Sequence, residues 1–217
     1  MNKQSIQNYL TQHGIIAIVR ADSGDGLARI VEAVMEGGVR CIEVTMTTPG
    51  ALGCIETASK NLAGADVCLG VGSVLDAETA RLAILAGAQY VVSPITSQDV
   101  INMAHRYGKP CMPGAFTPTE IYNAWMLGGD IIKVFPASCG GLSYIKAVRA
   151  PLPQIPIAPT GGVDLNNLAD FVKAGVVAIG VGGNLVSKKL IEARDYPGLA
   201  KSARRYADAF QSAREAL

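Results

Sequence analysis

One lysine, Lys133, lies within a run of residues that otherwise reads as a buried strand, DIIKVFPA (130–137). Because side chains alternate along a strand, Lys133 shares a face with Ile131 and Phe135. An ammonium group with such neighbours is poorly solvated, which favours the neutral amine that attacks ketones to form imines. The protonated imine is an electron sink, so a neighbouring carbon–carbon bond can break. A structural ion pair inside the fold is the alternative interpretation of this lysine.

Glu43 is a carboxylate inside a second predicted strand, CIEVTM from Cys41. Alternation aligns Glu43 with Cys41 and Thr45, and we interpret their shared face as the inner one. A buried carboxylate needs a partner or a function. Glu43 is suited to take the proton from a C4 hydroxyl group and to assist imine formation, directly or through a water. A simple Glu43–Lys133 ion pair is the alternative, and it would occupy the same site.

Arg20 ends the first predicted strand, IIAIVR from Ile15. Its planar guanidinium matches the geometry of a carboxylate or a phosphate, so Arg20 is a candidate anion-binding residue. An ion pair at the rim of the fold explains the same arginine as well.

Short β-rich runs alternate with amphipathic stretches that end in glycine, which is the pattern of strands connected by helices. Eight such strands, each followed by a helix, favour parallel pairing and closure into an α/β fold, a single-domain (β/α)8 TIM barrel over residues 1–217. An open doubly wound sheet is the alternative, but no GxGxxG turn follows the first strand. The predicted strands begin at Ile15, Cys41, Val67, Tyr90, Cys111, Ile131, Ile155 and Val176.

Glycine-rich turns follow or end the last two predicted strands: residues 160–162 read TGG, and residues 180–183 read GVGG. In such a barrel this pair of loops is the usual phosphate site, where backbone N–H groups and a helix N-terminus hold the anion. Glycine lets the backbone approach the phosphate closely, although glycines also serve only in tight turns. The candidate phosphate-binding residues are Thr160, Gly161, Gly162, Gly182 and Gly183.

Composition limits the classes of function. Of the 217 residues, 49% are hydrophobic and 17% are charged, so a sizeable core is available, and a net charge of +1 offers no basic field for nucleic acid. No apolar run is long enough for a membrane span, no signal peptide is seen, and five scattered cysteines suit a reducing cytoplasm. His13 and His105 lie away from the predicted strand ends, so we expect no metal and no cofactor.

Six segments stand in a specific order and spacing: GGVRCIEVTMTTP, LGVGSVLD, YVVSP, PGAFTPTE, IIKVFPA and PTGGV. Together they resemble the 2-keto-3-deoxy-6-phosphogluconate (KDPG) aldolase and 4-hydroxy-2-oxoglutarate (KHG) aldolase family. The resemblance covers nearly the whole chain, from IIAIVRAD to GVGGNLV. It implies a metal-free class I aldolase of barrel fold, a homotrimer that cleaves a phosphorylated keto-deoxy sugar acid to pyruvate and glyceraldehyde 3-phosphate.

The resemblance also implies roles for particular side chains. Lys133 matches the Schiff-base lysine, and Glu43 matches the general acid and base. Ser73 stands where the family usually has a threonine that binds the pyruvate carboxylate. Pro94 and Phe135 match residues that line the pocket.

The anion-binding positions match the family in part. Gly161 and Gly162 match its phosphate-binding glycines. Thr47 stands where some members have an arginine that contacts the keto-acid carboxylate, and we expect Arg20 to supply that charge instead. Gly183 stands where many members have a phosphate-binding serine, so the backbone N–H remains but the hydroxyl group is lost.

The expected reaction is cleavage of 2-dehydro-3-deoxy-6-phosphogluconate, with cleavage of 4-hydroxy-2-oxoglutarate to pyruvate and glyoxylate as a second activity. One alternative keeps the chemistry and changes the substrate to the galactonate epimer or another 2-keto-3-deoxy acid. A phosphate-barrel epimerase would need paired acids or a metal cluster at the strand ends, where we find Glu43 alone. A non-catalytic barrel that binds a phosphate or keto acid would bind its ligand without forming an imine.

Overall fold

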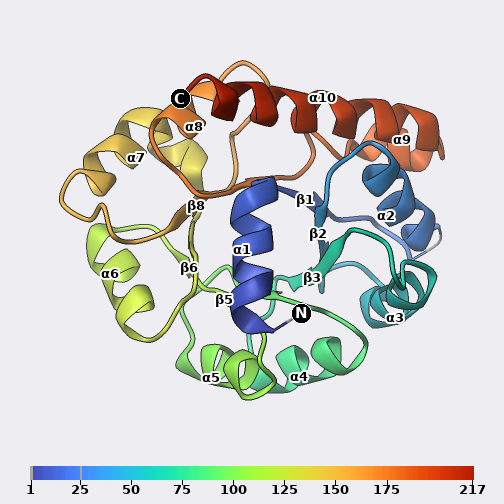
Figure 1. The fold of residues 1–217 in the computed structure, drawn as a ribbon. Helices are drawn as coiled ribbons and strands as arrows, with labels where there is room; N and C mark the ends of the chain where they lie inside the picture. The colour runs from blue at the N-terminus through green and yellow to red at the C-terminus, as the bar shows by residue number, and fades with distance from the viewer. Residues whose placement is uncertain (1, 25) are drawn as a thin grey trace.

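The computed structural model describes residues 2–24 and 26–217, in which helices surround a set of parallel strands (Figure 1). The strands are β1 (Ile15–Val19), β2 (Cys41–Thr45), β3 (Cys68–Gly72), β4 (Val91–Val92), β5 (Cys111–Met112), β6 (Gly114–Ala115), β7 (Ile132–Val134), β8 (Ile157–Pro159) and β9 (Ile179–Val181). The α-helices are α1 (Lys3–His13), α2 (Leu27–Glu36), α3 (Ala51–Asn61), α4 (Ala77–Leu85), α5 (Gln98–Arg106), α6 (Pro118–Met126), α7 (Gly141–Arg149), α8 (Leu168–Lys173), α9 (Lys188–Glu192) and α10 (Tyr196–Glu215), and a 3-10 helix spans Ala137–Cys139.

The strands of the described residues form two parallel sheets. One sheet has the order β5-β4-β3-β2-β1-β9, and the other has the order β6-β7-β8. The last strand, β9, therefore pairs with the first, β1, and the other neighbours follow chain order. A doubly wound sheet reverses its strand order partway across, so the observed order does not fit that alternative. The expected α/β fold with parallel strands and helical crossovers is confirmed.

The fifth predicted strand departs from the expectation, because it is divided at Pro113 into β5 and β6, which belong to different sheets. Proline lacks the N–H group that a continuous ladder would use. On the opposite side, Thr160 and Gly180 form an isolated parallel bridge just beyond β8, so the two sheets also contact each other there.

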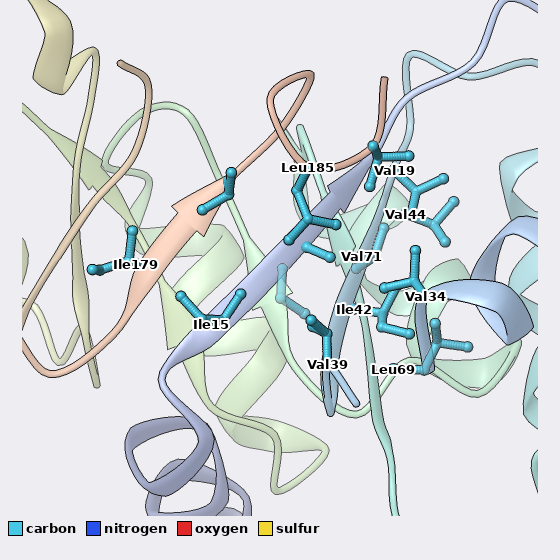
Figure 2. Close-up of a cluster of buried hydrophobic side chains, with 14 of the residues drawn as sticks. Ile15, Val19, Val34, Val39, Ile42, Val44, Leu69, Val71, Ile179 and Leu185 are labelled. Atoms are coloured by element: carbon cyan, nitrogen blue, oxygen red, sulfur yellow. The ribbon is translucent and has the colours of Figure 1, made fainter. Parts of the chain in front are cut away.

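Side chains alternate between the two faces of the strands and form two cores. Those that point outward pack against the helices, and Figure 2 shows part of this larger core, with side chains from β1, β2, β3 and β9. Those that point inward form a smaller group together with side chains of α1, and we call this group the inner cluster. Its buried members are Ile6, Leu10, Ile16, Cys41, Cys68, Tyr90, Val92, Met112, Ile131, Ala158 and Ala178.

Helix α1 closes the inner cluster at the amino ends of the strands, since Gly14 leads directly from α1 into β1. Figure 1 shows α1 in front of the strands, near the centre of the ring of helices. Ile6 and Leu10 of α1 are fully buried in the inner cluster, and burying such a side chain contributes about 1.5–3 kcal/mol. The opposite end, where the strands have their carboxyl ends, is therefore the open side.

Asp130, just before β7, holds this closed end together. Its carboxylate accepts hydrogen bonds from the Lys3 amine of α1 over 2.7 Å and from the backbone N–H of Cys111 over 2.8 Å. The ring nitrogen Nε2 of His105 lies 2.7 Å from the same carboxylate. His105 is thus part of a polar cluster far from the strand ends that carry the candidate site.

Candidate active site

Glu43 and Lys133 both lie on the inner side of the strands, where the exposed fractions of the two residues are 3% and 6%. Glu43 is the third residue of β2, and Lys133 is the middle residue of β7. In register, Lys133 lies between Gly114 of β6 and Ala158 of β8, and Ala158 belongs to the inner cluster. This placement agrees with the one that strand alternation predicts for both residues.

Burial and the neighbouring positive charges shift the pKa of Glu43 in opposite directions. Burial raises the pKa of the Glu43 carboxyl group, and the positive charges of Lys133 and Arg20 partly oppose this rise. Within residues 2–24 and 26–217, no carboxylate oxygen lies within 4.0 Å of the Lys133 amine, so Glu43 and Lys133 do not form a direct ion pair. A buried acid with a raised pKa is suited to both accept and return a proton near neutral pH.

Phe135 lies beside the lysine, and Pro94 lies beside the strand next to it. The Lys133 amine is 5.1 Å from the centroid of the Phe135 ring, which is a cation–π distance, and Phe135 is 39% exposed. Pro94 lies against Gly114, the strand neighbour of Lys133, so closely that a Cβ atom on Gly114 would collide with the Pro94 carbonyl group. Both predicted pocket residues are therefore adjacent to Lys133 or to its neighbouring strand.

Gly72 makes room for the Glu43 carboxyl group. In register Glu43 pairs with Gly70, yet a Cβ atom on Gly72 would lie 2.6 Å from Cγ of Glu43 and would collide with its carboxyl group. The Glu43 side chain therefore leans along β3 toward the carboxyl ends of the strands. Ser73 follows Gly72, has a left-handed backbone (φ 58°) and is partly buried, which brings the predicted carboxylate-binding residue beside Glu43.

Three threonines form a chain of hydroxyl groups after β2. Thr45 Oγ1 lies 3.1 Å from Thr47 Oγ1 and 3.2 Å from Thr48 Oγ1. The N–H of Ala21 donates to Thr48 Oγ1 over 3.1 Å and so joins the loop after β1 to the loop after β2. Arg20, next to Ala21, and Thr47 are both exposed at this rim. Thr47 therefore reaches the inner residues through Thr45, which strand alternation places on the same face as Glu43.

The loops after β8 and β9 are joined at the other side of the opening, where the side-chain amide of Asn184 donates to the Val163 carbonyl over 3.0 Å. Gly161 and Gly162 have positive φ angles of 91° and 78°, a conformation that glycine adopts without strain. Gly162 and Gly183 are exposed, and their N–H groups donate to no acceptor among the residues that the structure describes. Neighbouring N–H donors of this kind suit an anion.

Thr160 and Gly182 complete the set of predicted residues. Thr160 is buried, and a Cβ atom on Gly180 would lie 3.0 Å from the Thr160 methyl carbon, so Thr160 occupies the space that Gly180 leaves. Gly182 is partly exposed, and no atom of the described chain lies within 4 Å of the position its Cβ would take. Gly182 thus borders open space at the mouth of the site.

The sequence analysis missed the glycines inside the strands, which let side chains approach the backbone. Gly70 lies under the Tyr90 ring, Gly72 under Glu43, and Gly180 under Thr160. An isolated glycine within a predicted strand is a signal of such close approach. That signal was present in LGVGSV, but it does not identify which side chain fills the space.

Neither a metal centre nor a membrane span is found in the parts of the chain that the structure describes. No group of three or more His, Cys, Asp and Glu side chains there is placed to hold a metal ion. No described helix is both long enough and apolar enough to cross a bilayer.

A buried lysine and a buried glutamate on the inner side of parallel strands are the side chains with which an α/β enzyme can form and process an imine. Residues 6–201 match the family model described as KDPG and KHG aldolase. The chain therefore belongs to the KDPG and KHG aldolase family, as its resemblance predicted.

Individual relatives cover most of the chain. A 2-dehydro-3-deoxy-phosphogluconate aldolase of Treponema pallidum is 36% identical over 84% of this chain and 86% of its own length. A protein of Rhizobium meliloti, named as a probable 2-dehydro-3-deoxy-6-phosphogalactonate aldolase, is 40% identical over 79% of this chain and 81% of its own length. A solved structure described as native KDPGal is 31% identical, has a TM-score of 0.85, and aligns over 93% of this chain and 96% of that chain.

Gly72→Ala tests the placement of Glu43. The added methyl group would occupy the space of the Glu43 carboxyl group, and we expect overpacking to lower the free energy of unfolding by about 1–3 kcal/mol. Urea unfolding measures the change. Gly53→Ala is the matched control, because no atom lies within 4 Å of its added Cβ and the residue is in α3, where alanine is favoured over glycine by roughly 1 kcal/mol. Equal effects of the two substitutions would contradict the contact between Gly72 and Glu43.

Proposed function

We propose that this chain is a class I aldolase that forms a Schiff base on Lys133 and releases pyruvate from a 2-keto-3-deoxy acid. The observation that carries the proposal is the pair of buried inner residues Lys133 and Glu43, which face the open end of the strands without a direct ion pair. Membership of the KDPG and KHG aldolase family supports it.

The first half of the reaction forms the imine. The neutral Lys133 amine attacks the C2 ketone to give a carbinolamine, and Glu43 in its acid form assists the loss of water to give a protonated imine. The Glu43 carboxylate then takes the proton of the C4 hydroxyl group. As the C4 carbonyl forms, the C3–C4 bond breaks, and its electron pair moves into a C2=C3 enamine on Lys133. The aldehyde fragment leaves.

The second half releases pyruvate. The proton that Glu43 took from the C4 hydroxyl returns to C3, which converts the enamine to the protonated imine of pyruvate. Water adds to C2, the resulting carbinolamine collapses, and pyruvate leaves with the Lys133 amine restored. Protons balance over the cycle, and the steps require neither a metal nor a cofactor.

We assign recognition of the substrate to the loops around the opening. Arg20, Thr47 and Ser73 are proposed to bind the keto-acid carboxylate and the hydroxyl groups beside it, because they surround Glu43 on its open side. Pro94 and Phe135 form the walls beside Lys133.

We assign the terminal phosphate to the loops after β8 and β9. Gly162 and Gly183 offer exposed N–H donors there, with Gly161, Gly182 and Thr160 shaping the loops. The proposed substrate is 2-dehydro-3-deoxy-6-phosphogluconate, with 4-hydroxy-2-oxoglutarate as a second substrate. The galactonate epimer is the alternative, which the name of the Rhizobium meliloti relative favours.

We further propose that the two sheets act as one closed (β/α)8 barrel and that residues 1–217 form one domain. The pairing of β9 with β1 and the bridge between Thr160 and Gly180 support closure. We also propose a cytoplasmic homotrimer. Large apolar side chains remain exposed on α4 and α6, among them Leu82, Leu85 and Met126, and burial between subunits would remove them from water.

Reduction with borohydride in the presence of pyruvate tests the Schiff base. We expect a reduced pyruvyl adduct on Lys133, identified by peptide mass spectrometry, because borohydride reduces the imine to a stable amine. Lys133→Met is expected to abolish both the adduct and turnover while the far-UV circular dichroism spectrum is unchanged. A folded wild-type protein that binds pyruvate without any adduct would favour a non-catalytic binding barrel.

A panel of substrates tests phosphate recognition and the configuration at C4. If the glycine loops bind phosphate, kcat/KM for the 6-phosphorylated keto-deoxy acids should exceed that for the unphosphorylated acids by at least tenfold, roughly 1.4 kcal/mol. Pyruvate release is measured for the gluconate and galactonate epimers side by side. Equal rates with and without the phosphate would contradict the assigned loops but leave Lys133 chemistry intact.

Sedimentation equilibrium tests the assembly. We expect the mass of three 22.6 kDa chains for the wild type. A charge among the exposed apolar side chains of α4, Leu82→Glu, should shift the population toward monomer, and Glu78→Gln on the same helix serves as control. A wild-type mass of one chain would rule out the homotrimer.

A further inference from the structure

Tyr90 carries a buried polar group that the reaction above does not use. Its exposed fraction is 0%, and it belongs to the inner cluster just before β4. Its hydroxyl group has no hydrogen-bond partner among the described residues. Buried hydroxyl groups without partners are uncommon because they lose their hydrogen bonds to water. Replacing tyrosine with phenylalanine would remove this cost, so the retained hydroxyl group calls for a function.

The Tyr90 ring and the Glu43 carboxyl group cover neighbouring inner positions of β3. A Cβ atom on Gly70 would lie 2.5 Å from two ring carbons of Tyr90 and would collide with the carbon that bears the hydroxyl group. Gly70 is the register partner of Glu43, and Gly72, two residues further along β3, lies under the Glu43 carboxyl group. Tyr90 and Glu43 therefore occupy successive inner positions of β3, about 7 Å apart along the strand. One water, or a rotation of Glu43, spans such a separation.

Among the groups around Glu43, Tyr90 is the neutral hydrogen-bond donor on the side of the end closed by α1. Glu43 interacts with the positive charges of Lys133 and Arg20. Tyr90 interacts with the Cys41 and Cys68 thiols and with Glu43, and burial raises the pKa of its hydroxyl group well above the ordinary value. The Tyr90 hydroxyl group thus keeps its proton over the working pH range, and the neighbouring thiols are weak donors.

We propose that Tyr90 is a positioning residue for Glu43, whose ionised carboxylate accepts a hydrogen bond from the Tyr90 hydroxyl group, directly or through one water. The inference rests on the proposed role of Glu43 as the base. No proton is transferred to or from Tyr90. This hydrogen bond is absent while Glu43 is protonated. It forms when Glu43 loses its proton and becomes a carboxylate.

The proposed hydrogen bond shifts the pKa of Glu43 in a definite direction. A donor to the carboxylate favours the ionised form, so Tyr90 holds the pKa of Glu43 below the value that burial alone would give. Removing the hydroxyl group raises that pKa further. The carbon–carbon cleavage step needs ionised Glu43 in the bound imine, so its rate falls as the pH falls through this pKa, and the acidic limb of kcat should move to higher pH.

Tyr90→Phe keeps the ring over Gly70 and removes the donor. We expect the acidic limb of the pH profile of kcat to move up by at least half a pH unit, which is about a threefold lower rate on that limb, with little change on the plateau. Tyr206→Phe is the control. Tyr206 is also buried, but it lies on α10 in the larger core between the strands and the helices. If both variants alter stability but neither moves the limb, Tyr90 is merely structural and the proposal fails.

Two further measurements separate this proposal from the assignment of the reaction. The infrared C=O stretch of protonated Glu43, identified by its loss in Glu43→Gln, reports the ionisation of Glu43 without any turnover. Its midpoint should rise in Tyr90→Phe even if the chain cleaves no keto acid, and an unchanged midpoint overturns the proposal. Should Tyr90→Phe fail to fold, 3-fluorotyrosine at position 90, a stronger donor, should lower the same midpoint, and a midpoint that stays in place overturns the proposal equally.

Discussion

The constraint on which the rest of the structure depends is the burial of two ionisable side chains, Glu43 and Lys133, on one inner face. Moving a charged group out of water is costly unless it is paired, and no direct pairing occurs here. Burial raises the pKa of Glu43, while Lys133 and Arg20 restrain the rise without contact. The burial of the two groups therefore costs stability, which the surrounding apolar packing must supply.

The amino ends and the carboxyl ends of the strands differ in how they are covered. At the amino ends of the strands, α1 inserts Ile6 and Leu10, and Asp130 ties Lys3 of that helix to the start of β5. Water is therefore excluded from one end by apolar side chains and by a satisfied polar cluster. At the carboxyl ends the strands lead into loops with exposed residues, among them Arg20, Thr47, Gly162 and Gly183.

Sequence patterns predict which side chains lie on the inner face better than they predict how those side chains pack. Strand alternation alone places Glu43 with Cys41 on the inner face, because the period of a strand is independent of its neighbours. The contacts of Glu43 with Gly72 and of Tyr90 with Gly70 depend on the register between strands, which no single segment encodes. The division of the fifth predicted strand follows from Pro113 itself, because proline lacks the N–H group that a continuous ladder would use.

The residues proposed to react with the substrate lie on strands, whereas those proposed to bind its anionic groups lie in loops. Glu43 and Lys133 are fixed by strands whose neighbours on both sides are hydrogen-bonded, so their relative position tolerates little change. The groups proposed to bind anions lie in loops that are joined by single side chains such as Thr48 and Asn184. In this proposal, Thr47 and Gly183, where the family resemblance predicts arginine or serine in other members, change what is bound without moving Lys133 or Glu43. This separation lets one strand framework serve keto acids that differ at the end remote from the reacting carbonyl.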